Sequence, residues 1–264
     1  MLEINNAVKV FAPSTPNEMR ALNGLSLKLD DGEFVTVIGS NGAGKSTLFN
    51  AICGNFWLDE GSVILDGENI TFKSEHKRAK VIGRIFQDPM KGTAPHLTIE
   101  ENLALAYSRS KHAGLRIAVT KKERSMFMDA LAGFDIGLEN RMDTKVGLLS
   151  GGQRQVVTLL MATLVPPKLL LLDEHTAALD PATADKVMQI TKDIVRENNL
   201  TTLMITHNVT QALETGTRTI MLDAGNIIFD INSESRKTMT IDTLMAMYSE
   251  KKQKELATDS MIFS

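Results

Sequence analysis

The sequence is poor in cysteine and contains no long hydrophobic run, and each shortage excludes a class of protein. Cys53 is the one cysteine in 264 residues, so the chain cannot form an internal disulfide. This is typical of a reducing compartment such as the cytosol. No segment approaches the roughly 18 consecutive apolar residues of a membrane-spanning helix. Because Met1 to Asn5 also lack the basic start and apolar block of a secretion signal, we expect a chain that neither spans a membrane nor is exported.

The sequence also has little net charge. Lys and Arg number 29 and Asp and Glu 32, a formal balance of −3. Such a balance provides no general electrostatic attraction to nucleic acid or anionic lipid, so we expect no nucleic-acid partner. Hydrophobic residues make up 43% and charged residues 23%, which excludes a disordered chain. A length of 264 residues fits one large α/β domain.

Short apolar runs alternate with helical patterns, which predicts a mostly parallel β-sheet. Residues 1–34 read as short strands interrupted by a loop at 12–17, and residues 219–231 as a hairpin around 223–226. Asp180 and Pro181 resemble a helix cap followed by proline in the first turn, and that helix runs to Asn198. The further strands are expected at 33–38, 62–67, 81–86, 169–172 and 201–206.

The middle of the chain, from about residue 89 to 166, has helical signals instead. Three pairs have the spacing of a capping box, in which a hydroxyl and a carboxylate or amide three residues later satisfy each other's backbone. We therefore expect a helical subdomain inserted between strands. The three pairs are Thr98 with Glu101, Thr120 with Glu123, and Ser150 with Gln153.

From about residue 233 the chain becomes a charged tail with one amphipathic helix near 241–249.

The first motif that carries chemistry is a glycine-rich phosphate-binding loop that matches G-x-x-x-x-G-K-[ST]. Its glycines allow backbone N–H groups to surround phosphate oxygens, and the helix that follows adds the positive end of its dipole. Lys45 is expected to reach the β- and γ-phosphates, and the Ser46 hydroxyl to bind Mg²⁺. An apolar strand precedes the loop, as the motif requires. The loop consists of Gly39, Ser40, Asn41, Gly42, Ala43, Gly44, Lys45 and Ser46.

The second motif is the run of four leucines at 169–172 followed by Asp173 and Glu174. A buried strand that ends in Asp delivers a carboxylate to the sheet edge beside the phosphate loop, where it can hold Mg²⁺ through water. Glu174 is placed to act as general base on the attacking water. The alternative is a buried strand with two solvated acids at its end, and the phosphate loop weakens that interpretation.

The third motif is Leu149 to Gln155, with the sequence Leu-Ser-Gly-Gly-Gln-Arg-Gln. A helix start with Ser150 and two glycines offers a hydroxyl and unobstructed N–H groups to an anion. The simpler reading, in which Ser150 only caps the helix, is compatible with that role. Placed between the phosphate loop and Asp173, this motif resembles the signature of the ATP-binding-cassette (ABC) ATPases.

The resemblance covers about residues 2–232 and implies an architecture. It implies an α/β fold with a RecA-like P-loop NTPase core, an N-terminal antiparallel β subdomain and an inserted α-helical subdomain. The whole chain, 1–264, is then a single ABC ATPase domain, with its signature subdomain at about 89–166 and a helical tail at about 233–264.

Further site residues follow from the resemblance. Gln87 matches the glutamine that contacts Mg²⁺ and the attacking water, and His207 matches the switch histidine on the γ-phosphate. Ala178 to Asp180 match a loop that touches the opposite subunit. Phe11 is the candidate for stacking on adenine, with a plain core phenylalanine as its rival. His175 departs from the family, since many members have proline there. The expected nucleotide-binding residues are Phe11, Gly39, Ser40, Asn41, Gly42, Ala43, Gly44, Lys45, Ser46, Thr47, Ser150, Gly151, Gly152 and Gln153, with Ser46, Gln87 and Asp173 on the metal.

The resemblance also implies partners. ATP and Mg²⁺ are expected between two copies of the chain in a head-to-tail homodimer, with Lys45 from one subunit and Ser150 from the other. Separate membrane permease subunits dock near Gln87, at about 88–101, and hold the protein at the cytoplasmic face of the cell membrane. The expected function is import with an extracellular substrate-binding protein, and residues 172–181 resemble a subgroup for tryptophan or tyrosine uptake. Export, lipoprotein release and a non-transport ABC ATPase are the alternatives.

Overall fold

A six-stranded sheet forms the centre of the computed structural model, which describes residues 1–109, 119–236 and 238–262. The strand order is β10-β9-β3-β8-β7-β6, and all neighbours are parallel except β10, which pairs with β9 as the expected hairpin. The prediction of a mostly parallel sheet is confirmed. The strands are β3 (Phe34–Gly39), β6 (Ile82–Ile85), β7 (Leu169–Asp173), β8 (Thr202–Ile205), β9 (Arg218–Asp223) and β10 (Asn226–Ile231).

Alternating residues of the central strands supply two separate hydrophobic cores. Leu169 and Leu171 of β7 pack into the core that includes α1 (Lys45–Cys53), whereas Leu170 and Leu172 pack with α5 and α6 on the other face. This period of two explains why the strand is apolar throughout: both of its faces are covered. Helix α5 spans Gly151–Thr163 and α6 spans Pro181–Glu197, close to the predicted end at Asn198.

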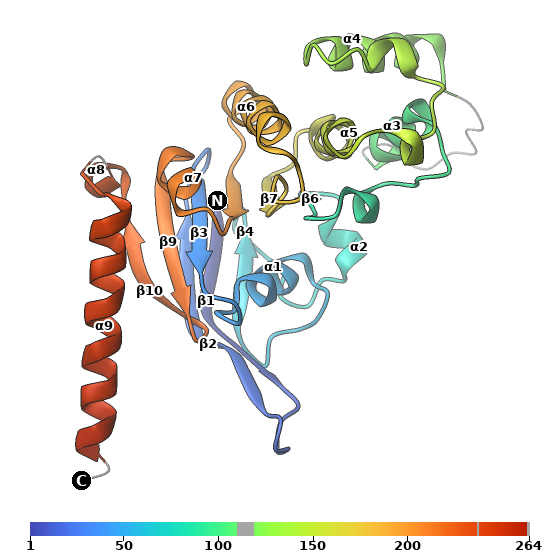
Figure 1. Ribbon diagram of the computed structural model, residues 1–264. Helices are drawn as coiled ribbons and strands as arrows, with labels where there is room; N and C mark the ends of the chain where they lie inside the picture. The colour runs from blue at the N-terminus through green and yellow to red at the C-terminus, as the bar shows by residue number, and fades with distance from the viewer. Residues whose placement is uncertain (110–118, 237, 263–264) are drawn as a thin grey trace.

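A second sheet of four antiparallel strands, in the order β2-β1-β4-β5, lies across the α1 side of the molecule (Figure 1). Its inward residues join the same core as α1. The N-terminal strands are longer than expected, because the loop at 12–17 is only the tip of a hairpin between β1 and β2. The strands are β1 (Leu2–Phe11), β2 (Met19–Leu29), β4 (Glu60–Leu65) and β5 (Glu68–Asn69).

The elements described between β6 and β7 are all helical and stand together at the upper right of Figure 1. They share a third hydrophobic core around Leu103, Phe127 and Val157. All three predicted capping boxes are confirmed, each with both of its reciprocal hydrogen bonds. Besides α5, the elements are the 3-10 turns η1 (Pro89–Gly92), η2 (Glu139–Arg141) and η3 (Val146–Leu148) and the helices α3 (Ile99–Ser108) and α4 (Lys121–Ala132).

The C-terminal tail contains more helix than the sequence pattern predicts. The short helix α8 (Ser233–Arg236) precedes α9, which begins at Ile241 as expected but continues to Ile262 (Figure 1). The prediction ended at 249 because apolar periodicity ends there. Good helix formers such as Lys, Gln, Glu, Leu and Ala follow, without glycine or proline to stop the helix. Leu244 attaches α9 to β9 and β10 through a fourth apolar cluster.

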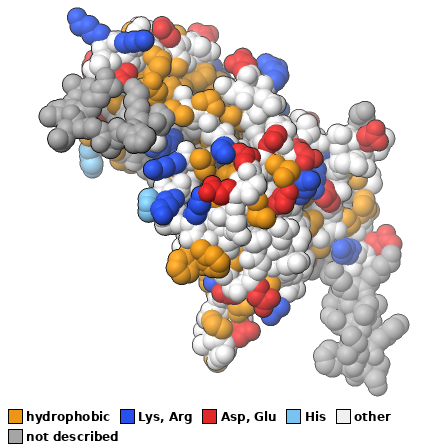
Figure 2. Space-filling view, turned by 180° about the vertical axis from the view of Figure 1, so that it is seen from behind, with side chains coloured by type: hydrophobic (Ala, Val, Ile, Leu, Met, Phe, Trp, Pro, Cys, Tyr) orange, Lys and Arg blue, Asp and Glu red, His pale blue; other side chains and the backbone are white. Residues whose placement is uncertain are grey.

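The surface carries charges of both signs. Figure 2 shows acidic and basic side chains interspersed over the described part of the rear face, with hydrophobic side chains in patches between them. Within the described residues, no helix combines the length and apolar character that crossing a bilayer requires. Trp57 and Phe72 form an exposed aromatic pair, with ring centroids 6.1 Å apart in an edge-on contact.

A buried arginine ties the C-terminal end of α1 to the segment that follows β5. Arg78, the last residue of the short helix α2 (Glu75–Arg78), is 1% exposed. Its guanidinium donates to the carbonyls of Ala51 and Ile52, at 2.7 and 2.8 Å, and to two carbonyls of the preceding loop. The end of a helix leaves such carbonyls without backbone partners, so Arg78 satisfies them.

Replacing Arg78 by leucine is expected to lower the free energy of unfolding by about 3 kcal/mol or more, because several buried carbonyls then lose a charged donor. Urea denaturation measures the change. Lys77→Leu is the matched control, since the adjacent Lys77 is exposed and its loss removes the same charge. Equal stability of the two variants would refute the capping role.

Candidate active site

The chemistry-bearing residues follow the carboxyl ends of neighbouring parallel strands. The phosphate loop follows β3, Asp173 ends β7, and His207 comes two residues after β8. Asp173 lies opposite Ile205 in the ladder between β7 and β8. Since parallel strands end at the same sheet edge, residues distant in the sequence meet there.

The phosphate loop requires glycine at its close backbone contacts. Gly44, immediately before α1, has φ +101°, and a Cβ there would lie 2.4 Å from the carbonyl oxygen of Ala21. A Cβ on Gly39 would lie 2.3 Å from the carbonyl oxygen of Leu222. No larger side chain fits at either position without moving backbone. The loop is thus held between β2 and β9 with its N–H groups at the start of a helix, which is an anion-binding arrangement.

Lys45 places its ammonium group inside this loop. The side chain is buried, and Nζ donates to the carbonyl oxygens of Gly39 and Ser40 at 2.7 and 2.9 Å. Burial lowers the pKa of Lys45, while the nearby carboxylates of Glu174 and Asp173 act in the opposite direction. The structure therefore brings the predicted phosphate-binding lysine and the two predicted acids into one electrostatic environment.

Asp173 has a partner that sequence reasoning missed. An Nη of Arg84 lies 3.1 Å from Oδ2 of Asp173, and the other Nη donates to Oδ1 of Asn50 on α1 at 2.8 Å. This arginine orients the carboxylate and links β6, β7 and α1. A signal was present in the sequence, since a charged residue within the apolar strand at 81–86 requires a buried partner.

Glu174 and His207 are also brought together. Nε2 of His207 lies 2.6 Å from Oε1 of Glu174, whose side chain is mostly buried while the histidine is half exposed. The backbone of Glu174 is left-handed, with φ +48°, and its N–H donates to the carbonyl of Ile205 at 3.0 Å. An acid that can accept a proton thus lies beside a histidine at an open edge of the site.

The donor set fits a magnesium ion. Ser46, Gln87 and Asp173 offer hydroxyl, amide and carboxylate oxygens, the ligand types that Mg²⁺ prefers. Ser46 and Gln87 are exposed and Asp173 is partly buried at the same sheet edge. The described residues contain no group of three His, Cys, Asp or Glu side chains that would enclose a metal alone. Such a donor set suits an ion held jointly by protein, water and phosphate.

The signature segment lies apart from the phosphate loop. Ser150 caps α5, accepting from the backbone N–H of Gln153, whose amide oxygen accepts from the Ser150 N–H in return. Gly152 packs so closely on α6 that a Cβ would lie 2.1 Å from Cγ2 of Thr183, whereas Gly151 is exposed beside Leu179. In Figure 1, α1 and α5 stand well apart. Within one chain, the two predicted phosphate-contacting segments are not brought together.

Phe11 ends β1 at the hairpin beside β2. Its ring is half-buried and packs edge-on against Phe56, with centroids 5.5 Å apart, and Nζ of Lys9 lies 5.7 Å from its centroid. This position leaves part of the ring accessible. Thr47, in the first turn of α1, is half-buried.

A polar network that links the segment after β7 to the segment after β8 was not predicted from the sequence. Gln211, in α7 (Val209–Glu214), accepts from the Thr206 hydroxyl at 2.7 Å and donates to that of Thr176 at 3.4 Å. It thereby joins the segment after Glu174 to the residue before His207. His175 is buried with its ring against α6, and burial lowers its pKa to about 4. In the sequence, His175 stood out only because it replaces the proline expected from the resemblance.

Comparison with known proteins gives a consistent result. The family model described as ABC transporter matches residues 22–177. A tyrosine transport ATP-binding protein of Clostridioides difficile is 43% identical over 248 residues, which cover 94% of this chain and 98% of that protein. A xylose/arabinose import ATP-binding protein of Sulfolobus acidocaldarius is 34% identical over 249 residues, 94% of each chain.

The fold is similar to solved cassettes. A dimeric structure of the ATP-binding cassette MJ0796 in a post-hydrolysis state, bound to ADP and Pi, aligns with a TM-score of 0.75 and 28% identity. It covers 88% of this chain and 99% of that cassette. The expected architecture of a nucleotide-binding core, an antiparallel β subdomain and a helical insertion is confirmed.

Proposed function

Because this chain belongs to the ABC transporter family and is an ATP hydrolase, we propose that it powers solute import through separate membrane permease subunits. The observation that carries the proposal is its similarity, over nearly the full length of both chains, to a relative named for tyrosine transport. We infer that the solute is an amino acid of the tyrosine type, delivered by an extracellular binding protein. The subunit then works at the cytoplasmic face of the membrane.

We infer that the working unit is a homodimer with ATP held between the two copies. Two observations support this: Gly151 is exposed at the start of α5, and the signature packs on α6 rather than on the phosphate loop. A similar cassette is dimeric in its ADP-bound structure. In a two-fold, head-to-tail pair, Ser150, Gly151, Gly152 and Gln153 of one copy complete the site on the other.

Within each composite site, this chain's residues divide the work. The loop N–H groups and Lys45 bind the phosphates, and Phe11 stacks on the base. Glu174 accepts a proton from the attacking water, while His207 and the partner copy's signature stabilise charge on the γ-phosphate. Ser46, Gln87 and Asp173 would hold Mg²⁺, which would supply charge neutralisation for the phosphates.

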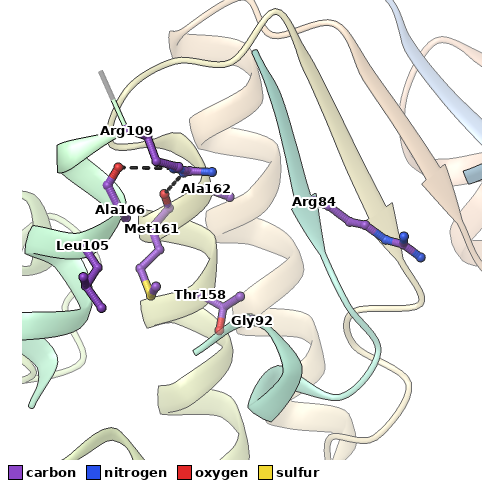
Figure 3. A pocket seen from close by; sticks show the side chains of 8 residues that line it. All are labelled: Arg84, Gly92, Leu105, Ala106, Arg109, Thr158, Met161 and Ala162. Atoms are coloured by element: carbon purple, nitrogen blue, oxygen red, sulfur yellow. Dashed lines mark hydrogen bonds between the residues drawn. The ribbon is translucent and has the colours of Figure 1, made fainter. Parts of the chain in front are cut away.

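The permease contact is proposed at a pocket between α3, α5 and η1 (Figure 3). The pocket measures about 260 Å³, and its lining includes Leu105, Met161 and Gly92, the last within the segment 88–101 expected to dock the permease. Arg109 shapes one wall by donating to the carbonyls of Ala106 and Met161 at 3.2 and 2.7 Å. The Arg84 side chain points away from the pocket. A pocket of this size suits one apolar side chain on a cytoplasmic helix of the permease.

Leu105→Glu is expected to abolish co-purification with the permease and uptake of labelled tyrosine in cells that carry the variant as their sole copy. Leu105 is 53% exposed, so the chain still folds and binds ATP, but the carboxylate cannot enter an apolar contact without a large desolvation cost. Pull-down with the permease and isotope uptake are the two measurements.

Ile241→Glu serves as the control, because Ile241 is a similarly exposed apolar residue on α9. It should leave both measurements unchanged. Normal uptake with Leu105→Glu would refute the docking site. Tyrosine uptake that persists without the chain would refute the substrate assignment.

A further inference from the structure

His175, in the turn that follows β7, makes a buried side-chain hydrogen bond that bridges to α6. Its ring is 2% exposed, and its Nε2 lies 3.1 Å from Oγ1 of Thr191. Thr191 is fully buried, and its hydroxyl lies 2.8 Å from the carbonyl oxygen of Val187. The bridge spans 16 residues of sequence, so only the fold brings its ends together.

The direction of these hydrogen bonds follows from the atoms present. A carbonyl oxygen only accepts, so the single hydroxyl proton of Thr191 goes to Val187. The Thr191 oxygen is then the acceptor towards His175, whose Nε2 carries the proton. The ring is thus a donor in a chain that runs from His175 through Thr191 into the backbone of α6.

His175, where the bridge begins, directly follows Glu174, whose left-handed backbone needs support from its surroundings. Glu174 is in the left-handed region, which a side chain of its size rarely occupies without help from its surroundings. Its N–H donates to Ile205 and its carbonyl accepts from Ala177, which anchors the peptide on two sides. The side chain of His175 adds a third anchor, because it connects this turn to Thr191 on α6.

We propose that His175 is a positioning residue, whose hydrogen bond to Thr191 holds the turn that directs the Glu174 carboxylate towards His207. This inference rests on the proposed role of Glu174 as general base. Proline, which many family members have here, restrains the backbone through its ring, whereas this chain restrains it through a side-chain bond to α6. The rival reading is that the imidazole only fills space in the core.

Substitutions at Thr191 separate these readings, because they leave the histidine in place. Thr191→Val keeps the shape and removes the acceptor, and Thr191→Ser keeps the acceptor. We expect kcat for ATP hydrolysis to fall about tenfold in Thr191→Val, with KM for ATP within about twofold of the parent, and Thr191→Ser to stay near the parent. His175→Leu should match Thr191→Val, and the double variant should be no slower than either single one.

Two outcomes would overturn the proposal. Parental kcat in Thr191→Val, whatever His175→Leu does, would assign His175 to space filling. Equal losses in Thr191→Val and Thr191→Ser would assign the effect to packing.

Glu174→Gln distinguishes this inference from the proposed function beneath it. If Glu174→Gln alone hydrolyses ATP at the parental rate, the base assignment fails independently of His175. If it is slow and Thr191→Val is parental, only the positioning role fails. In the Glu174→Gln background, Thr191→Val should have no further effect in single-turnover measurements, because no carboxylate remains to be directed; a further loss contradicts the proposal.

Discussion

Glu174→Gln is expected to slow ATP hydrolysis at least about a hundredfold while ATP binding is retained. Glutamine has the size of glutamate, and its amide oxygen can still accept from Nε2 of His207. The hydrogen bond that replaces the 2.6 Å contact therefore keeps the same donor. The amide cannot take a proton from water, which removes general-base catalysis alone. Single-turnover hydrolysis and equilibrium binding of ATP measure the two effects separately.

The same variant is expected to accumulate as a dimer in the presence of ATP and Mg²⁺. In the proposed dimer, bound triphosphate holds the two copies together, and slow cleavage prolongs that state. Size-exclusion chromatography with and without ATP detects it. Glu197→Gln, at the exposed end of α6, is the control and should behave like the parent. Parental turnover by Glu174→Gln would show that another group activates the water.

Lys45→Ala and Gly151→Asp, each inactive alone, are expected to recover activity when mixed. Lys45→Ala removes the ammonium from the phosphate loop and loses nucleotide affinity. Gly151→Asp leaves the loop intact but places a negative charge where the signature faces phosphate in the proposed dimer. Because Gly151 is exposed, and Asp suits the first turn of a helix, the variant should fold.

The recovery follows from the two-fold symmetry of the proposed dimer. In a mixed pair, one site combines both defects, and the other combines an intact phosphate loop with an intact signature. At equal concentrations half of the pairs are mixed, so activity should reach roughly a quarter of the parental value. Steady-state phosphate release measures it.

A second mixture is the matched control. Lys45→Ala with Glu174→Gln should show no recovery, because both residues act from the same copy and neither site of the mixed pair is whole. Recovery in this control, or none in the first mixture, would refute a site shared between copies. Full activity of the parent at dilutions where it is monomeric would do the same.

Local features of this chain were predictable because neighbouring residues produce them. Thr98, Thr120 and Ser150 each satisfy the backbone of their own helix within three residues, so the spacing alone predicts the caps. The turn at Gly44 and the continuous apolar run of β7 are equally local. The tail was less predictable, since beyond residue 249 helix propensity extends α9 without an apolar pattern.

The sequence by itself therefore determined the phosphate-loop motif, the caps and most of the segments that become strands, each through interactions over a few residues. Only the tertiary structure decided which side chains support them. Arg84 meets Asp173 because β6 and β7 are adjacent, and His175 reaches Thr191 because α6 folds back over the sheet. Such pairs depend on how distant elements pack, and that information is spread over the whole core rather than written in any one segment.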